Sequence, residues 1–226
     1  MKDAVSFHDW IKIIFDHPID DHCAWYFELD ANVDPVDGPT FIQYTTELFR
    51  ASAEFLRPYS DAQVNQGLNV LISNGISNSI FALKDEAILI ERRTAFLRAI
   101  FDLNRECFEP RCTPHLSHRD RDATPSDVSA LNAICYMWWD IFIIYGATDD
   151  PPTIPLHDAC LWVMENSLQL SNPAVLEGAL HGLGHWTLYQ PQRCEKIIDD
   201  FLRTHAKNLS PELQAYASAA RTGCIQ

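Results

Sequence analysis

The stretch from Val128 to Tyr145 constrains the fold more than any other part of the chain. Its apolar residues recur at steps of three and four and cover most of the circumference of an α-helix. Only Ser129, Asn132, Tyr136 and Asp140 mark a polar edge. A helix this apolar needs neighbours on several sides, so we expect it at the centre of a helical core. The run is shorter than the roughly 20 apolar residues that cross a membrane, and Asp140 interrupts it.

The rest of the chain predicts further helices and no sheet. No stretch alternates apolar and polar residues with period two. Helical patterns cover about residues 6–16, 38–57, 60–73, 76–83, 86–107, 156–169, 173–188, 191–205 and 211–221. Asn172-Pro173 and Ser210-Pro211 each pair a capping residue with proline at the first helical position. We therefore predict an all-α protein.

The helical pattern stops between residues 108 and 126, where Pro110, Pro114 and Pro125 fall. A connection this long is either functional or a boundary. We predict an N-terminal helical half at residues 1–107, a linker loop at 108–126 and a C-terminal half at 127–226. One continuous domain is the alternative.

Residues 172–184, with the sequence NPAVLEGALHGLG, resemble the first helix of a HEAT-like repeat of the PBS-lyase type. The proline, Val175, the small-Leu pairs and the Leu-Gly ending fall where such repeats have them. Residues 192–202 resemble the second helix, and 210–223 the start of the next unit. Helix starts near 127, 173 and 211 are about forty residues apart, a spacing typical of HEAT-type solenoids. The resemblance is clearest over residues 155–223 and implies stacked helical hairpins in an α-solenoid, with an irregular N-terminal half.

Three glycines inside the predicted helix 173–188 favour close helix packing. Gly178, Gly182 and Gly184 each cost roughly 1 kcal/mol relative to alanine. Close approach of a neighbouring helix is the simplest way to offset that cost, and stacked hairpins supply such approaches.

The HEAT-like resemblance implies a scaffold or binding module that offers a concave face to another protein. Some relatives of this type are enzymes. The deoxyhypusine hydroxylases hold iron through His-Glu dipeptides, and this sequence has none. The DNA glycosylases need a basic concave surface, whereas this chain has a net charge of −14, and nothing identifies a bilin site. We therefore expect a protein that is not an enzyme.

The net charge of the chain limits the classes of partner that it can bind. It has 17 basic and 31 acidic residues, a balance that repels nucleic acids and anionic membranes. We predict a protein-binding or scaffold module whose acidic surface meets a basic protein, a bacterial immunity or inhibitor-type protein being one concrete form. The segment 16–37 would supply its contacts, through Asp20, Asp21, Trp25, Tyr26 and Glu28.

The cysteines indicate a reducing compartment. There are seven, an odd number, and Cys135, Cys160 and Cys194 fall within apolar helical patterns. They are typical of small buried apolar residues rather than of a disulfide framework. With no signal peptide in the sequence, we expect a cytoplasmic protein.

Glu177, His181 and His185 recur at steps of four, in a line along one helix and away from its predicted core stripe. Two histidines one turn apart can ligate one metal ion, and the carboxylate can join them. This line predicts either a face that contacts a partner or a metal site. The second case gives the alternative function, a metal-dependent enzyme or a metal-binding protein.

Cys107, Cys112, His115 and His118 form a second set of potential ligands, for zinc. In the other interpretation, Cys107 completes an apolar face and the histidines are solvated. Asp140 on the central stretch needs at most one partner and no catalytic role. Because no nucleophile elbow, phosphate loop or dinucleotide fingerprint occurs, we predict no catalytic residues and no cofactor other than a metal ion.

Overall fold

The computed structural model describes residues 5–20, 22–120, 126–146 and 153–225. Regular structure in these ranges is entirely helical, as the sequence predicts. The α-helices are α1 (Phe7–Phe15), α2 (Gly38–Arg50), α3 (Ser52–Phe55), α4 (Asp61–Ile72), α5 (Ile90–Leu103), α6 (Glu109–Arg111), α7 (Leu131–Ile141), α8 (Ile154–Ser167), α9 (Pro173–Thr187), α10 (Pro191–His205) and α11 (Pro211–Arg221). None of these helices is both long and apolar enough to span a membrane.

Several of the α-helices begin at a polar side chain that caps the first turn, and two of these, Asn172 and Ser210, are the capping residues that the sequence predicts. The side chains of Ser6, Ser60, Asn172 and Ser210 each accept a hydrogen bond from a backbone N–H in the first turn of the following helix. These bonds satisfy N–H groups that have no partner within the helix. The helices α9, α10 and α11 all begin at a proline, whose fixed backbone angle suits the first turn.

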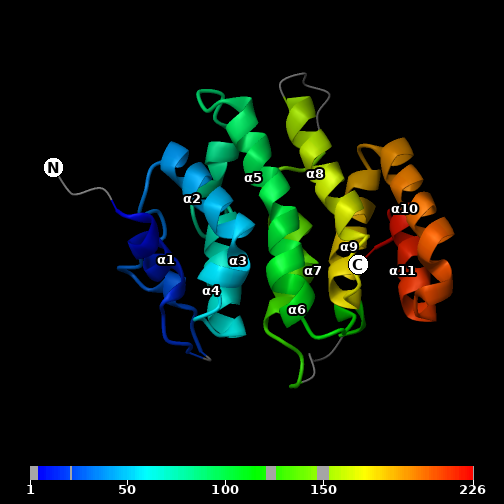
Figure 1. The fold of residues 1–226 in the computed structure, drawn as a ribbon, viewed down its shortest axis with the longest axis horizontal. Coiled ribbons are helices and arrows are strands. Elements are labelled where there is room, and N and C mark those ends of the chain that lie inside the picture. The colour runs from blue at the N-terminus through cyan, green and yellow to red at the C-terminus, as the bar shows by residue number, and fades with distance from the viewer. Residues whose placement is uncertain (1–4, 21, 121–125, 147–152, 226) are drawn as a thin grey trace.

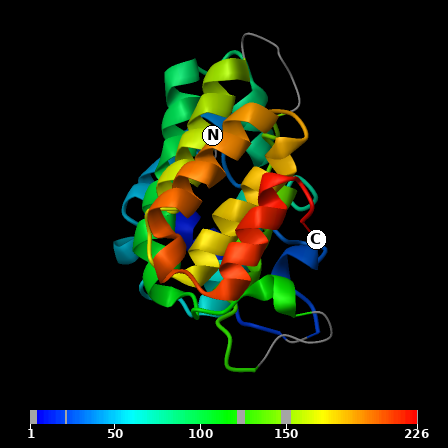
Figure 2. The same ribbon diagram turned by 90° about the vertical axis from the view of Figure 1, so that its right-hand side faces the viewer.

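The helices pack in two rows that follow the chain along the long axis of the molecule (Figure 1). In one row α5 packs against both α2 and α8. In the other row α1, α4, α7, α9 and α11 each pack against the next. At the C-terminal end α10 packs against α9 and α11, and Figure 2 shows α10 and α11 side by side there.

Helices from both predicted halves pack on one another. The helix α4 contacts α7 and α5 contacts α8, and each pair joins elements on opposite sides of residues 108–126. One cluster of buried apolar residues runs from Trp10 to Ala220. Part of the predicted linker, the segment Thr113–Asp120, lies on this helical body and is called the strap below.

The most enclosed helix is α9 rather than the Val128–Tyr145 stretch. Twelve of the fifteen residues of α9 are buried. The helix α7 covers only Leu131–Ile141 and keeps an exposed face that includes Met137 and Asp140. After Ile141 the backbone becomes extended at Phe142. Hydrophobicity alone therefore overestimates the burial of α7. The small residues of α9 allow neighbouring helices to approach α9 from several sides, and this makes α9 the more enclosed helix.

Two of the three glycines of α9 lie where α7 comes closest, whereas Gly184 lies against Ile225, which follows α11, rather than against a helix. A Cβ atom at Gly178 would lie 2.5 Å from the backbone oxygen of Cys135. At Gly182 it would lie 2.4 Å from Cδ1 of Trp139. Both distances are shorter than any van der Waals contact, so these positions require glycine.

The buried cysteines behave as small apolar residues, which is the prediction for Cys135, Cys160 and Cys194. All seven cysteines are free thiols, and only Cys23 and Cys224 are exposed. Burial raises the pKa of the Cys107 thiol to about 12 and that of Cys194 to about 11. These thiols stay protonated at neutral pH and are poor nucleophiles.

We expect Gly178→Ala to lower the free energy of unfolding by about 2 kcal/mol. Alanine is the better helix former, so a gain is expected if propensity dominates. The backbone of α7 cannot move aside as a flexible side chain can, and the added methyl group therefore forces α7 and α9 apart. Urea unfolding measures the change. Gly75→Ala is the matched control, because the nearest atom to its Cβ is 3.6 Å away; equal stability of the two variants would contradict the packing argument.

Candidate metal centre

Glu177, His181 and His185 lie one turn apart along α9, on the side that faces α7 and α11. Their exposure rises along the helix, because Glu177 is fully buried, His181 is 2% exposed and the His185 side chain is 46% exposed. The face that was predicted to contact a partner is therefore buried at Glu177 and His181. The strap covers Glu177, and Tyr216 of α11 contacts His181, so neither of these two side chains can reach a partner protein.

Asp140 of α7 meets both histidines. Its Oδ2 atom lies 3.0 Å from Nε2 of His181, and its Oδ1 atom is in short contact with Nε2 of His185. The two Nε2 atoms are 3.2 Å apart. The prediction that Asp140 has at most one partner is therefore wrong. In the described part of the chain, these three residues form the one group of metal-ligand side chains whose donor atoms all lie within 4.8 Å of one another.

The spacing of these donor atoms fits a transition-metal ion. Two ligand atoms bound about 2.1 Å from one ion lie about 3.0 Å apart at a right angle and about 3.4 Å apart at a tetrahedral angle. The nitrogen–nitrogen distance of 3.2 Å and the distance of 3.0 Å from Asp140 Oδ2 to Nε2 of His181 fall in this range, whereas Asp140 Oδ1 lies closer than this to Nε2 of His185. Two imidazoles and a carboxylate are a frequent ligand set for zinc and non-haem iron.

Hydrogen bonds to Tyr216 orient the His181 ring. The Tyr216 hydroxyl donates to the Tyr136 hydroxyl at 3.2 Å, and its oxygen lies 2.6 Å from Nδ1 of His181. Because the single hydroxyl hydrogen of Tyr216 is used toward Tyr136, we assign the proton of the second bond to Nδ1 of His181. Nε2 then faces Asp140, and a bound ion would replace the hydrogen that Nε2 donates to this carboxylate. A hydrogen bond on the far nitrogen is the usual way in which proteins orient a metal-binding histidine.

The electrostatics keep Asp140 ionised. Burial raises the pKa of its carboxyl group, but hydrogen bonds from His181 and His185 outweigh burial and hold that pKa well below its ordinary value. Burial also raises the pKa of Tyr216, which therefore stays neutral. The cluster thus gathers a carboxylate and two imidazole Nε2 atoms around one shared space, where a cation could replace the hydrogens between them.

Glu177 holds the strap instead of joining this cluster. Its carboxylate accepts the backbone N–H groups of Ser117 at 2.7 Å and His118 at 3.0 Å, and it contacts Nδ1 of His118 closely. The His118 ring stacks on Tyr216, with the ring centroids 4.4 Å apart. Two of the three predicted ligands on α9 therefore meet at one point, while the third holds the strap against α9.

The predicted zinc set on and before the strap does not converge. Cys107 and Cys112 are buried in the core. His115 pairs with Asp120 at 2.8 Å, and His118 pairs with Glu177. Cys107 completes the apolar face, as the alternative interpretation expects, but both histidines bind carboxylates rather than water alone.

The predicted partner residues of segment 16–37 are split between core and surface. Trp25 is 5% exposed and stacks on His17, with ring centroids 3.7 Å apart, and Tyr26 is half-buried. Asp20 and Glu28 are exposed, and Asp21 lies outside the described residues. Burial of Trp25 removes it as a contact residue, because its ring completes the packing beside α1.

Sequence reasoning missed Asp140 as a ligand and Tyr216 as its supporting residue. The signal for Asp140 was available, since an acid within an apolar helix requires a polar partner. No signal placed Tyr216, because α11 meets α9 only through the tertiary fold.

We expect Glu177→Gln to lower the free energy of unfolding by about 2 kcal/mol, because an amide cannot accept all the hydrogen bonds that the carboxylate does. Chemical denaturation measures this loss. Glu165→Gln, at an exposed position of α8, is the matched control and should leave stability unchanged. A stable Glu177→Gln protein would show that the strap does not depend on the carboxylate.

No family model, curated protein or solved structure matches this chain.

Proposed function

We propose that this protein binds one divalent transition-metal ion through Asp140, His181 and His185. The observation that carries the proposal is the convergence of one carboxylate and two imidazole nitrogens at the spacing of ligands on a single ion. Two helices supply the ligands, α7 and α9, and both are packed in the core. The mixed nitrogen and oxygen set favours zinc, iron or manganese over calcium or magnesium, which prefer oxygen ligands.

The exposure of His185 bears on what such an ion can do. Its side chain is 46% exposed and that of Asp140 is 20% exposed, so an ion between them faces solvent on one side. Three protein ligands with an open position are typical of catalytic metal sites, whereas structural sites are closed by four. A bound ion supplies Lewis acidity and lowers the pKa of a coordinated water. This open side favours a metal-dependent enzyme over a protein in which the metal ion is purely structural.

The first test is the metal content of the purified protein, measured by inductively coupled plasma mass spectrometry. We expect about one zinc, iron or manganese per chain. His185→Ala and Asp140→Asn should each lose most of it while keeping the helical circular dichroism spectrum. His8→Ala, which removes an exposed histidine on α1, should keep the metal and is the matched control.

Two further variants separate ligands from neighbours. Tyr216→Phe removes the acceptor for Nδ1 of His181, so we expect a metal affinity about 10- to 100-fold lower. Glu177→Gln should retain the metal, because that carboxylate is engaged with the strap. Metal-free wild-type protein that also fails to bind added zinc in a competition assay would overturn the proposal, as would full retention by His185→Ala and Asp140→Asn.

The helices that carry this centre support a HEAT-like arrangement, which we propose for α7 to α11. The NPAVLEGALHGLG sequence contains the N-cap and most of α9, and its residues Gly178 and Gly182 lie against α7. The packing of α7, α9 and α11 in series is what stacked hairpins require. In that arrangement the α-solenoid acts as a rigid support for the metal ligands.

A second candidate function is the binding of a basic protein in a reducing cytoplasm. This function would involve neither nucleic acid nor a membrane. The observation that favours it is the exposure of apolar residues among acids in segment 16–37. Phe27 is 67% exposed and Leu29 is fully exposed, beside the carboxylates of Glu28 and Asp30. Apolar anchors ringed by charge are typical of protein interfaces.

The charge contribution of this segment can be measured with an arginine-rich peptide, nona-arginine. The triple variant Asp20→Asn, Glu28→Gln, Asp30→Asn should reduce the association rate in low salt more than the control triple Glu54→Gln, Glu86→Gln, Glu165→Gln. Both variants remove three exposed acids and have the same net charge, so only the location of the charge differs. Stopped-flow fluorescence gives the rates. Equal rates, or rates insensitive to ionic strength, would count against the acidic segment as a docking surface.

A further inference from the structure

A pocket of about 420 Å³ lies between α4, the strap and α7. Its volume is within the range of small-molecule sites, about 300–1,000 Å³. The residues that line it include Asn65 of α4, Ser117 and Asp120 of the strap, and Ala133, Tyr136 and Met137 of α7.

The pocket lies one helical turn before the candidate metal ligand on α7. Tyr136 and Met137 precede Asp140 by four and three residues, which places them about 4.5–6 Å from it along the helix axis. The Tyr136 ring also packs against the ring of His181, with the centroids 4.2 Å apart. Tyr136 therefore borders the pocket on one side and contacts a metal ligand on the other.

The helix α9 gives the same placement. Its two glycine contacts follow the same order along α7 and α9, so the two helices run parallel. The backbone N–H of Ser117 donates to Glu177, which precedes His181 by one turn. The pocket thus lies on the N-terminal side of the metal ligands along both helices. A ligand in it can extend along the exposed face of α7 to Asp140.

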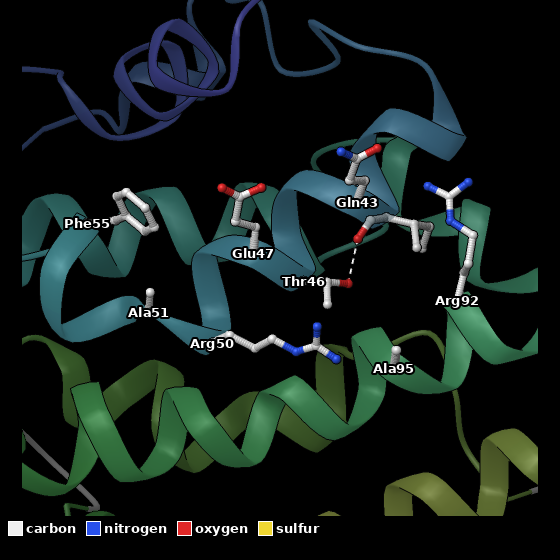
Figure 3. Close-up of a pocket in the computed structure, with 9 residues that line it drawn as sticks. Gln43, Thr46, Glu47, Arg50, Ala51, Phe55, Arg92 and Ala95 are labelled. Atoms are coloured by element: carbon white, nitrogen blue, oxygen red, sulfur yellow. Dashed lines mark hydrogen bonds between the residues drawn. The ribbon is translucent and has the colours of Figure 1, made fainter.

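The larger groove of about 540 Å³ between α2 and α5 has no such relation to the metal ligands. Its lining residues fall within residues 42–55 and 92–95, and none of them belongs to α7 or α9. Figure 3 shows the guanidinium groups of Arg50 and Arg92 apart from each other in this groove. The pocket beside α7, in contrast, adjoins the metal centre.

The pocket offers hydrogen bonds but no positive charge. Its lining residues include no lysine or arginine. The Ser117 hydroxyl and the Nδ2 group of Asn65 form no hydrogen bond with any described residue, so both are available to a ligand. The carboxylate in the lining, that of Asp120, is already engaged, because both of its oxygens lie within 3.0 Å of Nε2 of His115.

We propose that this pocket binds an uncharged polyhydroxylated compound, a sugar, and holds one of its hydroxyl groups toward the ion. This inference rests on the proposed metal function. Sugars combine hydroxyl groups with hydrocarbon faces, and the pocket combines Ser117 and Asn65 with the apolar side chains of Ala133 and Met137.

Charged ligands fit the pocket less well. An anion finds no cationic side chain in the lining, and the net charge of −14 opposes its approach. A cationic amine is repelled by a bound metal ion and finds the carboxylate of Asp120 already engaged by His115.

The test compares two metal-chelating probes on the full-length protein loaded with zinc. Gluconohydroxamic acid carries the chelating hydroxamate on a chain of hydroxyl-bearing carbons, and hexanohydroxamic acid carries it on a hydrocarbon chain of the same length. We expect isothermal titration calorimetry to show about fivefold to tenfold tighter binding of the gluconohydroxamic acid, because only its chain can bond to Ser117 and Asn65.

Three variants locate this preference. Ser117→Ala and Asn65→Ala should each weaken the binding of gluconohydroxamic acid about threefold to tenfold and leave hexanohydroxamic acid unchanged. Zinc should stay bound to Ser117→Ala, because the backbone of Ser117 and not its hydroxyl bonds to Glu177. Ala133→Trp, at an exposed position of α7, fills the pocket and should weaken both long probes but not acetohydroxamic acid, which is little more than the chelating group.

The control variant is Ser218→Ala. Ser218 is an exposed serine of α11 outside the pocket, so the preference for gluconohydroxamic acid should persist. Equal affinity for the two long probes, or an unchanged preference in both Ser117→Ala and Asn65→Ala, would overturn the sugar pocket and leave the metal centre standing. Failure of zinc to bind, or of acetohydroxamic acid to bind the zinc-loaded protein, would count against the metal centre and overturn this inference with it.

Discussion

The close contact between α7 and α9 is the constraint on which the candidate metal centre depends. Gly178 lies against the backbone of Cys135, and Gly182 lies against the ring of Trp139. Asp140 follows Trp139 in sequence, and His181 precedes Gly182. The same absence of side-chain atoms that lets the helices touch therefore brings the carboxylate of α7 within bonding distance of the imidazoles of α9. The glycines reduce helix propensity, and the packing of two core helices offsets that cost.

This contact also encloses polar groups that are costly to bury. A carboxylate and an imidazole in the core must find hydrogen-bond partners or lose several kcal/mol. Glu177 finds them in the backbone of the strap, and His181 finds them in Tyr216 and Asp140. Because His118 of the strap stacks on Tyr216, the strap and the candidate metal ligands belong to one connected polar network. Glu177 acts on the strap, whereas His181 is oriented by its own bonds to Tyr216 and Asp140.

The sequence predicts local features of this fold well. Helix caps, the prolines at helix starts and the need for a close neighbour at Gly178 and Gly182 follow from backbone chemistry, which acts within a few residues. Burial of Glu177 and His181 could not be predicted in this way, because it depends on the strap and on α11, which are distant in sequence. The role of Asp140 falls between these cases. Its charge in an apolar helix required a partner, but only the packing of α7 on α9 determines that it has two.

The acidic composition acts differently on cations and on anions. A net charge of −14 raises the local concentration of cations around the whole molecule, which favours loading of a metal site that opens to solvent beside His185. The same field opposes anions, so an anion site on this protein needs cations that its own acids do not neutralise.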